Sequence, residues 1–531
     1  MRKTAITFLL TFAAFASYAQ TAYDGLLFSE NNYEGTARSV AMGNAFTALG
    51  GDLGSISINP AGSAVAGYSQ FTITPGLTFA ASTAQGVSPF SDGSLPYFER
   101  KMRSSMTKFS IPNMGLTINW DTNRTSGLKN LTFGFVANKT ASFDQDVYAN
   151  GMNSTTTFMG AMAVEATGLK AADLNAKDAY DYNPWSSVVG YQSGMISTYG
   201  GYDDEYVGAT ELIFDNGDIV LGGDIDQTYG RRTSGSKYDY VFNLGGNISD
   251  FLYLGANVGI SSLDYSYDEY FKEVAIDPAD FEITFDDGKS MYFNQMKYRY
   301  YYEAEGSGVY AKFGAILTPG FGLRIGAAVQ TPTVNTITER WQYSGSTEFS
   351  SSSYNGYAAS PEGEYTYTVV SPFRANFGVA YTLLNFAVVS ADYEFTDYGQ
   401  MQFRTTGSDR DWFEEVNNDI REIFGPQHML RFGAEIKLGA LAVRGGYGTT
   451  TSPEVHFDGP YRSNFSFGLG YSSKGSFYAD LAVRKNSYSK EYYMPYADYI
   501  FNEDDSIAEP VPEILITRSD WKALLTFGWR F

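Results

Sequence analysis

The chain has 531 residues, a formal net charge of −22 and no cysteine. Without cysteine it holds no disulfide and no Cys-ligated zinc or iron–sulfur site. The negative charge argues against nucleic acid as a partner, because phosphate binding needs a basic surface. Aromatic residues make up 16% of the chain, which is too many for a disordered protein.

The first 19 residues have the pattern of a secretory signal. Two basic residues at positions 2–3 precede a short apolar stretch, 4–16, and Ser17 and Ala19 place small residues where a signal peptidase cuts. We therefore expect export and cleavage between Ala19 and Gln20; the alternative is a buried N-terminal helix. No later stretch reaches the ~18 apolar residues of a membrane-spanning helix, and no cysteine follows to carry a lipid anchor.

Residues 20–69 do not alternate between apolar and polar. Residues 37–49 are rich in small and apolar side chains and look partly helical, and Gly50-Gly51 ends that stretch as glycine ends helices. Residues 56–62 (ISINPAG) are expected to be extended and bounded by a turn. Fifty residues build little core alone, so this segment needs another surface to pack against.

From residue 70 the dominant period of the apolar residues is two. In 252–260, for example, Leu, Leu, Ala, Val and Ile alternate with Tyr, Gly, Asn and Gly. This pattern fits either a sandwich or a barrel with lipid outside and water inside. Fourteen segments have it: 70–81, 107–120, 130–140, 237–248, 251–262, 306–318, 321–330, 365–381, 384–396, 428–438, 441–448, 463–472, 475–484 and 521–531.

The connections between these segments alternate between long and short along the whole chain. A sandwich has no reason to sort its connections in this way, whereas an outer-membrane barrel has short periplasmic turns and long outer loops. We therefore predict an all-β fold, a transmembrane antiparallel β-barrel of about fourteen strands over residues 70–531. Because strand edges carry errors of about 2–4 residues, twelve or sixteen strands also fit. The two longest outer loops are expected at 141–236 and 263–305.

The final segment supports a membrane barrel independently. Residues 521–531 place Trp521, Phe527, Trp529 and Phe531 on one face, and a terminal Phe on a last strand resembles the C-terminal assembly signal of outer-membrane barrels. A soluble edge strand would leave these rings against solvent. We therefore assign Trp529 and Phe531 as the signal read by the barrel-assembly machinery.

A fourteen-stranded barrel has a lumen too wide for its own wall to fill, so residues 20–69 are expected to plug it. Residues 35–62 (GTARSVAMGNAFTALGGDLGSISINPAG) resemble the N-terminal hatch of the FadL/TodX family of outer-membrane transporters, and Asn59-Pro60-Ala61 matches that family's Asn-Pro-Ala motif. Segments 321–333, 390–403 and 429–447 resemble the same family. The resemblance implies a plugged fourteen-stranded barrel that admits hydrophobic molecules, such as long-chain fatty acids or aromatic hydrocarbons, and a kinked strand that opens sideways.

Two sets of residues are candidates for the passage itself. Asn59, Pro60 and Ala61 are predicted to control it, since Pro60 fixes its backbone and Asn59 can bond neighbouring backbone; the alternative is a simple turn into the first strand. Pro112, with Gly115, is the candidate kink, because proline removes a donor from the strand ladder; the alternative is a strand that begins later.

Charged residues on the predicted inner face are candidates to hold a ligand carboxylate. An Arg can bind a carboxylate in bidentate fashion, and the candidates are Arg431 and Arg324, then Arg444. The alternative is that these arginines neutralise neighbouring acids: Glu435 falls opposite Arg444 across the turn at 439–440, as a normal cross-strand ion pair.

The negative charge lies mainly in the two long loops. Residues 141–236 hold 14 Asp and Glu against 4 Lys and Arg, and residues 263–305 hold 11 against 4. Residues 157–174 are compatible with a helix. The loops could capture apolar ligands, or could be a solvated surface that binds divalent cations without selectivity.

We therefore predict passive outer-membrane transport of hydrophobic small molecules by a monomer that contacts outer-membrane lipid and lipopolysaccharide. The alternatives are a general or peptide porin and a surface receptor or adhesin acting through the acidic loops. A haem receptor is a further variant, although only His428 and His456 offer imidazole ligands. We expect no enzyme activity, cofactor or metal site, because no nucleophile–base set stands out.

Overall fold

The computed structural model describes residues 21–88, 97–214, 219–285, 287–384, 386–405, 410–457, 459–473, 476–502 and 506–531. The predicted signal peptide therefore lies outside the described residues. In these ranges, no helix is both long and apolar enough to cross a membrane.

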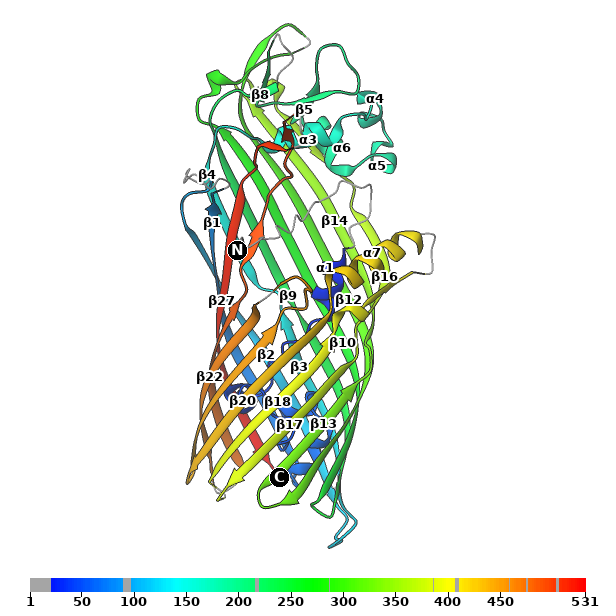
Figure 1. The fold of residues 1–531 in the computed structure, drawn as a ribbon, viewed down its shortest axis with the longest axis vertical. Coiled ribbons are helices and arrows are strands. Elements are labelled where there is room, and N and C mark those ends of the chain that lie inside the picture. The colour runs from blue at the N-terminus through cyan, green and yellow to red at the C-terminus, as the bar shows by residue number, and fades with distance from the viewer. Residues whose placement is uncertain are drawn as a thin grey trace.

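Fourteen antiparallel strand positions close into one barrel, which confirms the predicted fold class (Figure 1). Each strand pairs with its neighbour in the chain, and the last, β27, returns to pair with β1. The wall consists of β1 (Gln70–Val87), β2 (Met102–Asp121), β3 (Leu128–Ser142), β9 (Ile225–Ile248), β10 (Leu252–Ala275), β12 (Ser290–Gly320), β13 (Leu323–Gln330) continued by β14 (Val334–Phe349), β17 (Arg374–Leu383) below β16 (Gly363–Val370), β18 (Ala387–Asp397), β20 (Pro426–Leu438), β21 (Leu441–Thr451), β22 (Pro460–Ser472), β23 (Phe477–Tyr488) and β27 (Glu513–Arg530).

The two faces of the wall have opposite character. On β20, Leu430, Phe432 and Ile436 are exposed on the outside, whereas Arg431 and Glu435 are buried inside. This arrangement inverts that of a soluble protein and suits a wall with lipid outside. The six predicted short turns join barrel strands at the end where the C-terminus lies (Figure 1).

The wall is much taller on one side than on the other (Figure 1). Strands β9, β10 and β12 have 24, 24 and 31 residues, whereas β20 to β23 have 11 to 13. A membrane-spanning strand needs only ~9–11 residues. The tall wall therefore extends well beyond a bilayer, and much of the expected loop 263–305 is strand.

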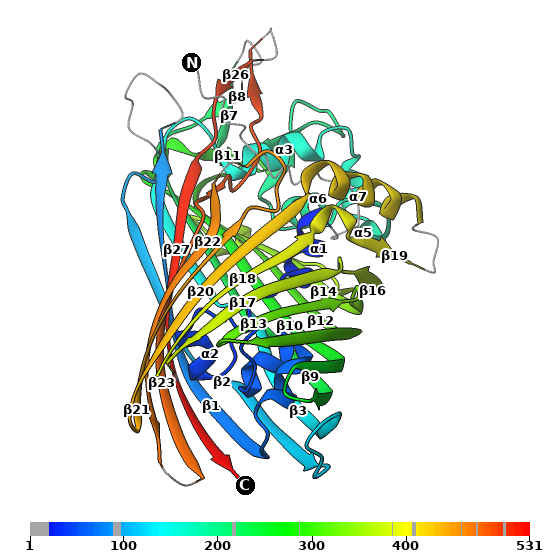
Figure 2. The same cartoon turned by 60° about the horizontal axis from the view of Figure 1, so that its bottom comes forward.

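A cap covers the top of the tall wall (Figure 2). Part of the expected loop 141–236 forms it, and α3 and α4 fall inside the stretch predicted to be helix-compatible. The last long connection also reaches the cap through Tyr496, which packs in the same apolar cluster. The cap region comprises β4 (Gln145–Asn153), α3 (Phe158–Ala166), α4 (Ala171–Leu174), α5 (Ala179–Tyr182), α6 (Trp185–Gln192), β5 (Ile196–Thr198), β6 (Tyr206–Gly208), β7 (Glu211–Ile213), β8 (Ile219–Leu221), β11 (Glu282–Thr284), β15 (Gly356–Ala359), β24 (Glu491–Tyr493), β25 (Ile500–Phe501) and β26 (Ile507–Glu509).

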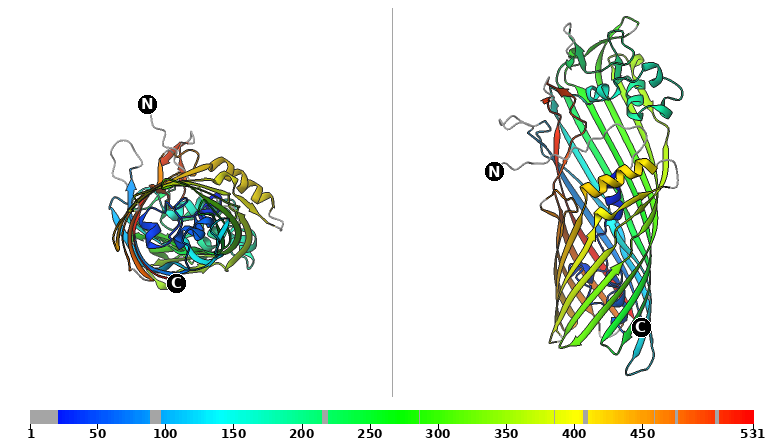
Figure 3. Two further views of the ribbon diagram at one scale, coloured as in Figure 1. Left: turned by 90° about the horizontal axis from the view of Figure 1, so that it is seen from below. Right: turned by 45° about the vertical axis from the view of Figure 1, so that its right-hand side comes forward.

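Residues 21–69, called the hatch below, lie inside the barrel (Figure 3). The hatch contains α1 (Ala22–Ser29), α2 (Ala37–Ala41) and two 3-10 helices, η1 (Leu53–Ser57) and η2 (Pro60–Val65). Outside it, β19 (Gln402–Arg404) precedes α7 (Arg410–Ile423), whose buried Phe413, Val416 and Ile420 join the apolar cluster of α1.

One local prediction for the hatch was right only in part, and another was wrong. Residues 37–49 are partly helical, as predicted, but the helix ends at Ala41 and not at Gly50-Gly51, because Gly43 adopts a positive φ of 63° that reverses the chain. Residues 56–62, predicted to be extended, lie mostly in 3-10 helices. The side chains of Asp52 and Asn59 accept backbone N–H groups at the starts of η1 and η2, which favours helical turns there.

Candidate functional site

The Asn-Pro-Ala motif lies where the hatch meets the tall wall. Asn59 accepts the backbone N–H of Ala61 at 3.1 Å and so begins η2. Its amide nitrogen donates to the carbonyl of Thr47 at 2.7 Å and to that of Ala315 on β12 at 3.1 Å. One side chain thus joins two hatch turns and a barrel strand.

Glycines on the wall permit this close contact. A Cβ on Gly314 would lie 1.9 Å from Oδ1 of Asn59, and one on Gly255 would lie 2.3 Å from the carbonyl carbon of Pro60. Any larger residue would push the hatch away. Asn243 on β9 also donates its amide to the carbonyl of Pro60 at 3.0 Å. The motif therefore contacts β9, β10 and β12 together.

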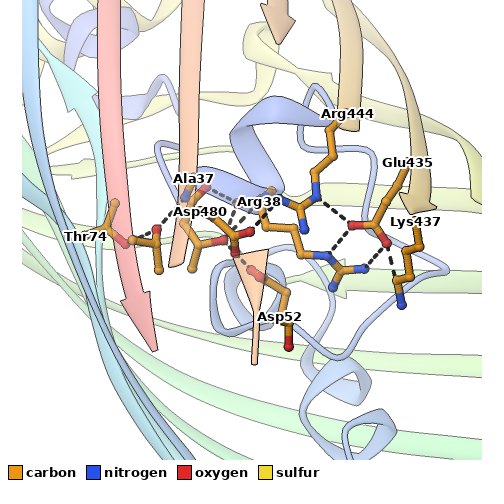
Figure 4. A network of polar contacts seen from close by, with 12 residues as sticks. Ala37, Arg38, Asp52, Thr74, Glu435, Lys437, Arg444 and Asp480 are labelled. Carbon is orange, nitrogen blue, oxygen red and sulfur yellow. Dashed lines mark hydrogen bonds and ion pairs between the residues drawn. The ribbon is translucent and has the colours of Figure 1, made fainter. Parts of the chain in front are cut away.

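A charged network holds α2 against the short wall (Figure 4). Arg38 donates from Nε to Glu435 at 2.9 Å, and Arg444 donates to the same carboxylate at 2.6 Å. Arg444 also bonds Asp480 at 2.6 Å. Glu435 is 1% exposed, so this carboxylate faces two guanidinium groups with almost no water.

A second network holds the turn after α2. Both the backbone N–H and the hydroxyl of Thr47 donate to Asp392 on β18 at 2.7 Å. Arg431 lies next to it, 3.0 Å from Glu394 and 4.0 Å from Asp392. Removing one member would leave an uncompensated buried charge.

The three arginines proposed as carboxylate contacts all have partners within the protein. Glu435 and Arg444 lie opposite each other and form the expected ion pair. Arg431, for which the sequence suggested no partner, faces Asp392 across β18 and β20. Arg324 donates to the carbonyl of Leu49 in the hatch at 2.7 Å. That these arginines bind a ligand carboxylate stays a prediction, whereas the structure shows their contacts with the wall and the hatch.

The strand ladder changes at Pro112. Between Thr74 and Gly76 of β1, β2 accommodates one extra residue and the register shifts. Pairing between β2 and β3 begins only at Asn113, below the bulge. Residues 102–110 of β2 therefore pair with β1 but not with β3, so this side of the wall has a discontinuity.

The hatch occupies the inner side of that discontinuity. The backbone N–H groups of Asn32 and Glu34 donate to the carbonyls of Thr140 and Lys139 on β3. These carbonyls belong to a bulge in the pairing of β3 with β9. Gly115, just below Pro112, lets Leu53 of the hatch approach, since a Cβ there would lie 2.7 Å from its side chain.

Buried carboxyl groups cap the outer end of the molecule. Glu273 lies 21 residues above the lower end of β10, and it accepts the N–H of Phe158 at 2.7 Å and the hydroxyl of Thr157 at 2.6 Å, at the start of α3. Burial raises the pKa of Glu273 to about 7. Burial likewise raises the pKa of Glu211 to about 7 in the same region. Both groups lie outside the expected membrane span.

Sequence reasoning missed two features of this site. The first is the role of the acids of the hatch: Glu34 pairs with Lys522 of β27, and Asp52 accepts the hydroxyl of Thr36 at 2.7 Å within the hatch itself. No local pattern marks such contacts between distant segments. The second is the long aromatic wall around Tyr300, which the sequence placed in a loop; the alternation of tyrosines in residues 298–302 was a signal for strand.

The assembly residues lie at the base of the wall. Trp529 and Phe531 are exposed on the outer face, and Phe71 on β1 stacks near Trp529 with ring centroids 6.0 Å apart. Their function as an assembly signal stays a prediction.

Comparisons with known proteins agree with this architecture. No protein-family model matches the chain, and no curated protein matches it in sequence. A FadL homologue from Pseudomonas aeruginosa superposes with a TM-score of 0.50 at 12% identity, over 94% of this chain and 99% of that one. The toluene transporters TbuX of Ralstonia pickettii and TodX of Pseudomonas putida give TM-scores of 0.46 and 0.47 at 13% and 12% identity, over 94% and 95% of this chain and 99% and 100% of theirs.

At this low identity, similarity to the FadL homologue establishes the fold. It confirms the architecture that the sequence resemblance implied: a closed antiparallel barrel whose N-terminal segment lies in the lumen. The chain therefore has the fold of a FadL homologue.

Proposed function

We propose that this protein is an outer-membrane channel through which hydrophobic small molecules pass, with the hatch as its gate. The observation that carries the proposal is the discontinuity at Pro112, which the hatch lines from inside. A hydrophobic molecule gains nothing from a water-filled pore, because burial of its apolar surface supplies the driving force. A side exit between β2 and β3 would let it enter lipid without crossing water.

The contacts at the discontinuity are few. Above Asn113 no backbone hydrogen bond joins β2 to β3 among the described residues. The links seen there are the hydroxyl of Tyr238, which donates to the carbonyl of Ile111 at 3.4 Å, and an ion pair of 3.9 Å between Lys108 and Asp144. Lys108 is half exposed and lies 3.9 Å from the buried Asp144, and a pair with one end in solvent at this distance contributes ~1 kcal/mol. Side-chain movement could therefore widen the gap at small cost.

The closed lumen disfavours a general porin. The hatch contacts β9, β10, β12 and β18 through Pro60, Asn59 and Thr47. Such a barrel would conduct ions poorly unless the hatch moved. Fatty acids and aromatic hydrocarbons both remain within the proposed ligand class, and location in a Gram-negative outer membrane with its lipopolysaccharide is part of the same proposal.

The test is transport by purified protein in lipid vesicles, with Pro112→Ala as the decisive variant. Alanine restores a donor at the bulge, and we expect slower entry of an apolar dye into the bilayer by at least threefold. Pro372→Ala, at the break between β16 and β17, is the matched control and should leave entry unchanged. Equal rates for wild type and Pro112→Ala would remove the side exit from the proposal. No protein-dependent entry of any apolar compound would refute the transport function itself.

A further inference from the structure

The inner face of the tall wall carries a regular grid of aromatic side chains above the hatch. Across β10, β12 and β14, Tyr267, Tyr302 and Trp341 lie in one register row. The next row toward the cap contains Glu269, Tyr300 and Tyr343. We call the five aromatic residues of these two rows, with Tyr265 on β10 and Trp185 on α6, the aromatic grid.

The rings of the grid form a continuous path from cap to hatch. Trp185 lies 5.8 Å from Trp341 and 6.4 Å from Tyr343 between ring centroids. Tyr343 lies 4.7 Å from Tyr300, which lies 6.0 Å from Tyr267. The path ends in the apolar cluster that contains α1 of the hatch.

Part of this surface is accessible. Tyr302 and Trp341 are buried, at 5% and 8% exposure. Trp185, Tyr300 and Tyr343, in contrast, are only partly buried, although protein surrounds them on several sides. Partly exposed ring faces in a row offer stacking surface to a flat ligand.

Carboxylates predominate among the charged groups around the grid. Glu269 and Glu339 face inward from the wall, and Glu339 accepts the hydroxyl of Tyr302 at 2.6 Å. Asp24 of the hatch and Glu165 of the cap act on the same rings. The pKa of Tyr300 is raised first by burial and then by Tyr343, Glu339 and Asp24. The pKa of Tyr343 is raised first by burial and then by Glu165.

No free cation faces the grid among the described residues. Arg231, which acts on Tyr265, is held by Glu491 at 2.6 Å. Arg299 and Arg340 belong to grid strands but alternate with the grid residues and pair with Asp268 and Glu364 on the outer face. Burial raises the pKa of Glu269 to about 7, so this group is neutral or negative, never positive.

We propose that the aromatic grid is a binding site for ring-bearing ligands that are neutral or positively charged, and that it excludes anions. Stacking favours any flat ring, and ring faces with nearby carboxylates favour a cation. An anion would lose its water and find mostly carboxylates, because Arg231, the cation that acts on Tyr265 and Glu269, is already paired with Glu491. The inference rests on the proposed transport function only in that the grid leads toward the hatch. If the inference holds, a fatty acid with a free carboxylate is a poor ligand for the aromatic grid.

The test uses three ligands that share one ring system: 2-naphthylmethylammonium, 2-naphthylmethanol and 2-naphthoate. Binding to the purified full-length protein is measured by equilibrium dialysis at pH 7.5. We expect the ammonium and the alcohol to bind at least tenfold more tightly than the carboxylate. Glu269→Gln should weaken the ammonium about threefold and leave the alcohol unchanged.

The variant Tyr300→Leu/Tyr343→Leu removes two rings but keeps apolar volume, and it should weaken the ammonium and the alcohol at least fivefold. Tyr182→Leu, an exposed cap residue outside the grid, is the matched control and should bind as wild type. A heat-dependent gel shift verifies that each barrel is folded, and Tyr300→Leu alone replaces the double variant if that fails.

Two results would overturn the proposal that the grid binds ligands: naphthoate binding as tightly as the ammonium, or unchanged binding in the tyrosine variant. Entry of the neutral alcohol into vesicles is measured in parallel. Normal entry together with either result would refute the grid and leave the transport function standing, whereas absent entry would refute transport.

Discussion

The inner face of this barrel carries two different chemistries at two heights. Around the hatch, charged groups of both signs meet in pairs, as Arg38 and Arg444 do on Glu435. Around the aromatic grid, rings dominate and most of the charges are acids. Because the same strands continue from one level to the other on the tall side, the difference lies in the side chains and not in the backbone.

Each chemistry suits its place. Paired charges in a closed lumen fix one position of the hatch, because a displaced hatch would leave buried charges without partners. Rings that are partly exposed make no such demand and can exchange one flat neighbour for another at low cost. The charged level is therefore suited to holding the hatch, and the aromatic level to the proposed passage of ligands. The predictions below test how firmly the hatch is held, and how the cap above the grid is held.

The largest expected effect comes from removing the hatch. A chain without residues 20–62 keeps all barrel strands but loses the contacts of Arg38, Thr47 and Asn59. We expect single-channel conductance in planar bilayers to rise at least tenfold. Unchanged conductance in a folded barrel would show that the wall and cap, not the hatch, close the lumen.

Breaking one pair should loosen the hatch strongly. Glu435→Ala removes the carboxylate shared by Arg38, which is 22% exposed, and by Arg444, which keeps Asp480, so we expect the lower end of the cost of a broken buried pair, about 3 kcal/mol. Hydrogen exchange in α2 should accelerate accordingly. Glu364→Ala, which removes the exposed partner of Arg340, is the control and should cost less than about 1 kcal/mol. Equal exchange in both variants would contradict a charged hold on the hatch.

The stability of the cap should fall as the pH rises, whereas a salt-bridged carboxylate loses its contribution as the pH falls. Because burial raises the pKa of Glu273 from 4.5 to about 7, the folded cap binds a proton more tightly than the unfolded one. Stability is then full below about pH 4.5 and falls as pH rises to 7, by about 3 kcal/mol. Hydrogen exchange in α3 should therefore quicken between pH 5 and 8, beyond its intrinsic change. Glu273→Gln should reduce that response and leave the part that Glu211 contributes.

A smaller effect is expected from Asn59→Ala. The variant loses the cap of η2, worth about 0.5–2 kcal/mol, and the donor to Thr47 and Ala315. Exchange in η2 should quicken, while exchange in α2 stays as in wild type. Asn418→Ala, on α7 and away from the hatch core, should change neither. A matching loss in α2 would mean that the hatch unfolds as one unit.

Much of the barrel follows from the sequence alone. Alternation such as that of residues 252–260 sets which face of a strand meets lipid, and the sorting of short and long connections sets the strand directions. The pairing of Glu435 with Arg444 followed from register across a two-residue turn. The upper part of the tall wall, residues 263–305, was predicted as loop, because acids and tyrosines there lack the apolar face that lipid imposes.

Within the site, the sequence singled out Asn59 and Pro112 but not their contacts. The amide of Asn59 bonds residues 256 and 12 positions away, and no local pattern encodes such separations. The partner of Arg431, Asp392, lies across β18 and β20, which a long connection joins, so register could not be counted through it.

The sequence by itself determined a barrel, its strand order, its plug and the sign of its charge. The reason is that a lipid-facing strand must alternate apolar and polar residues with a period of two, and this alternation can be read directly from the order of the residues. The tertiary structure alone decided where the hatch is held, where β2 leaves β3, and that rings of three strands form one surface. Those features depend on closure of the barrel, which brings β27 beside β1 and places the hatch among strands up to hundreds of residues away.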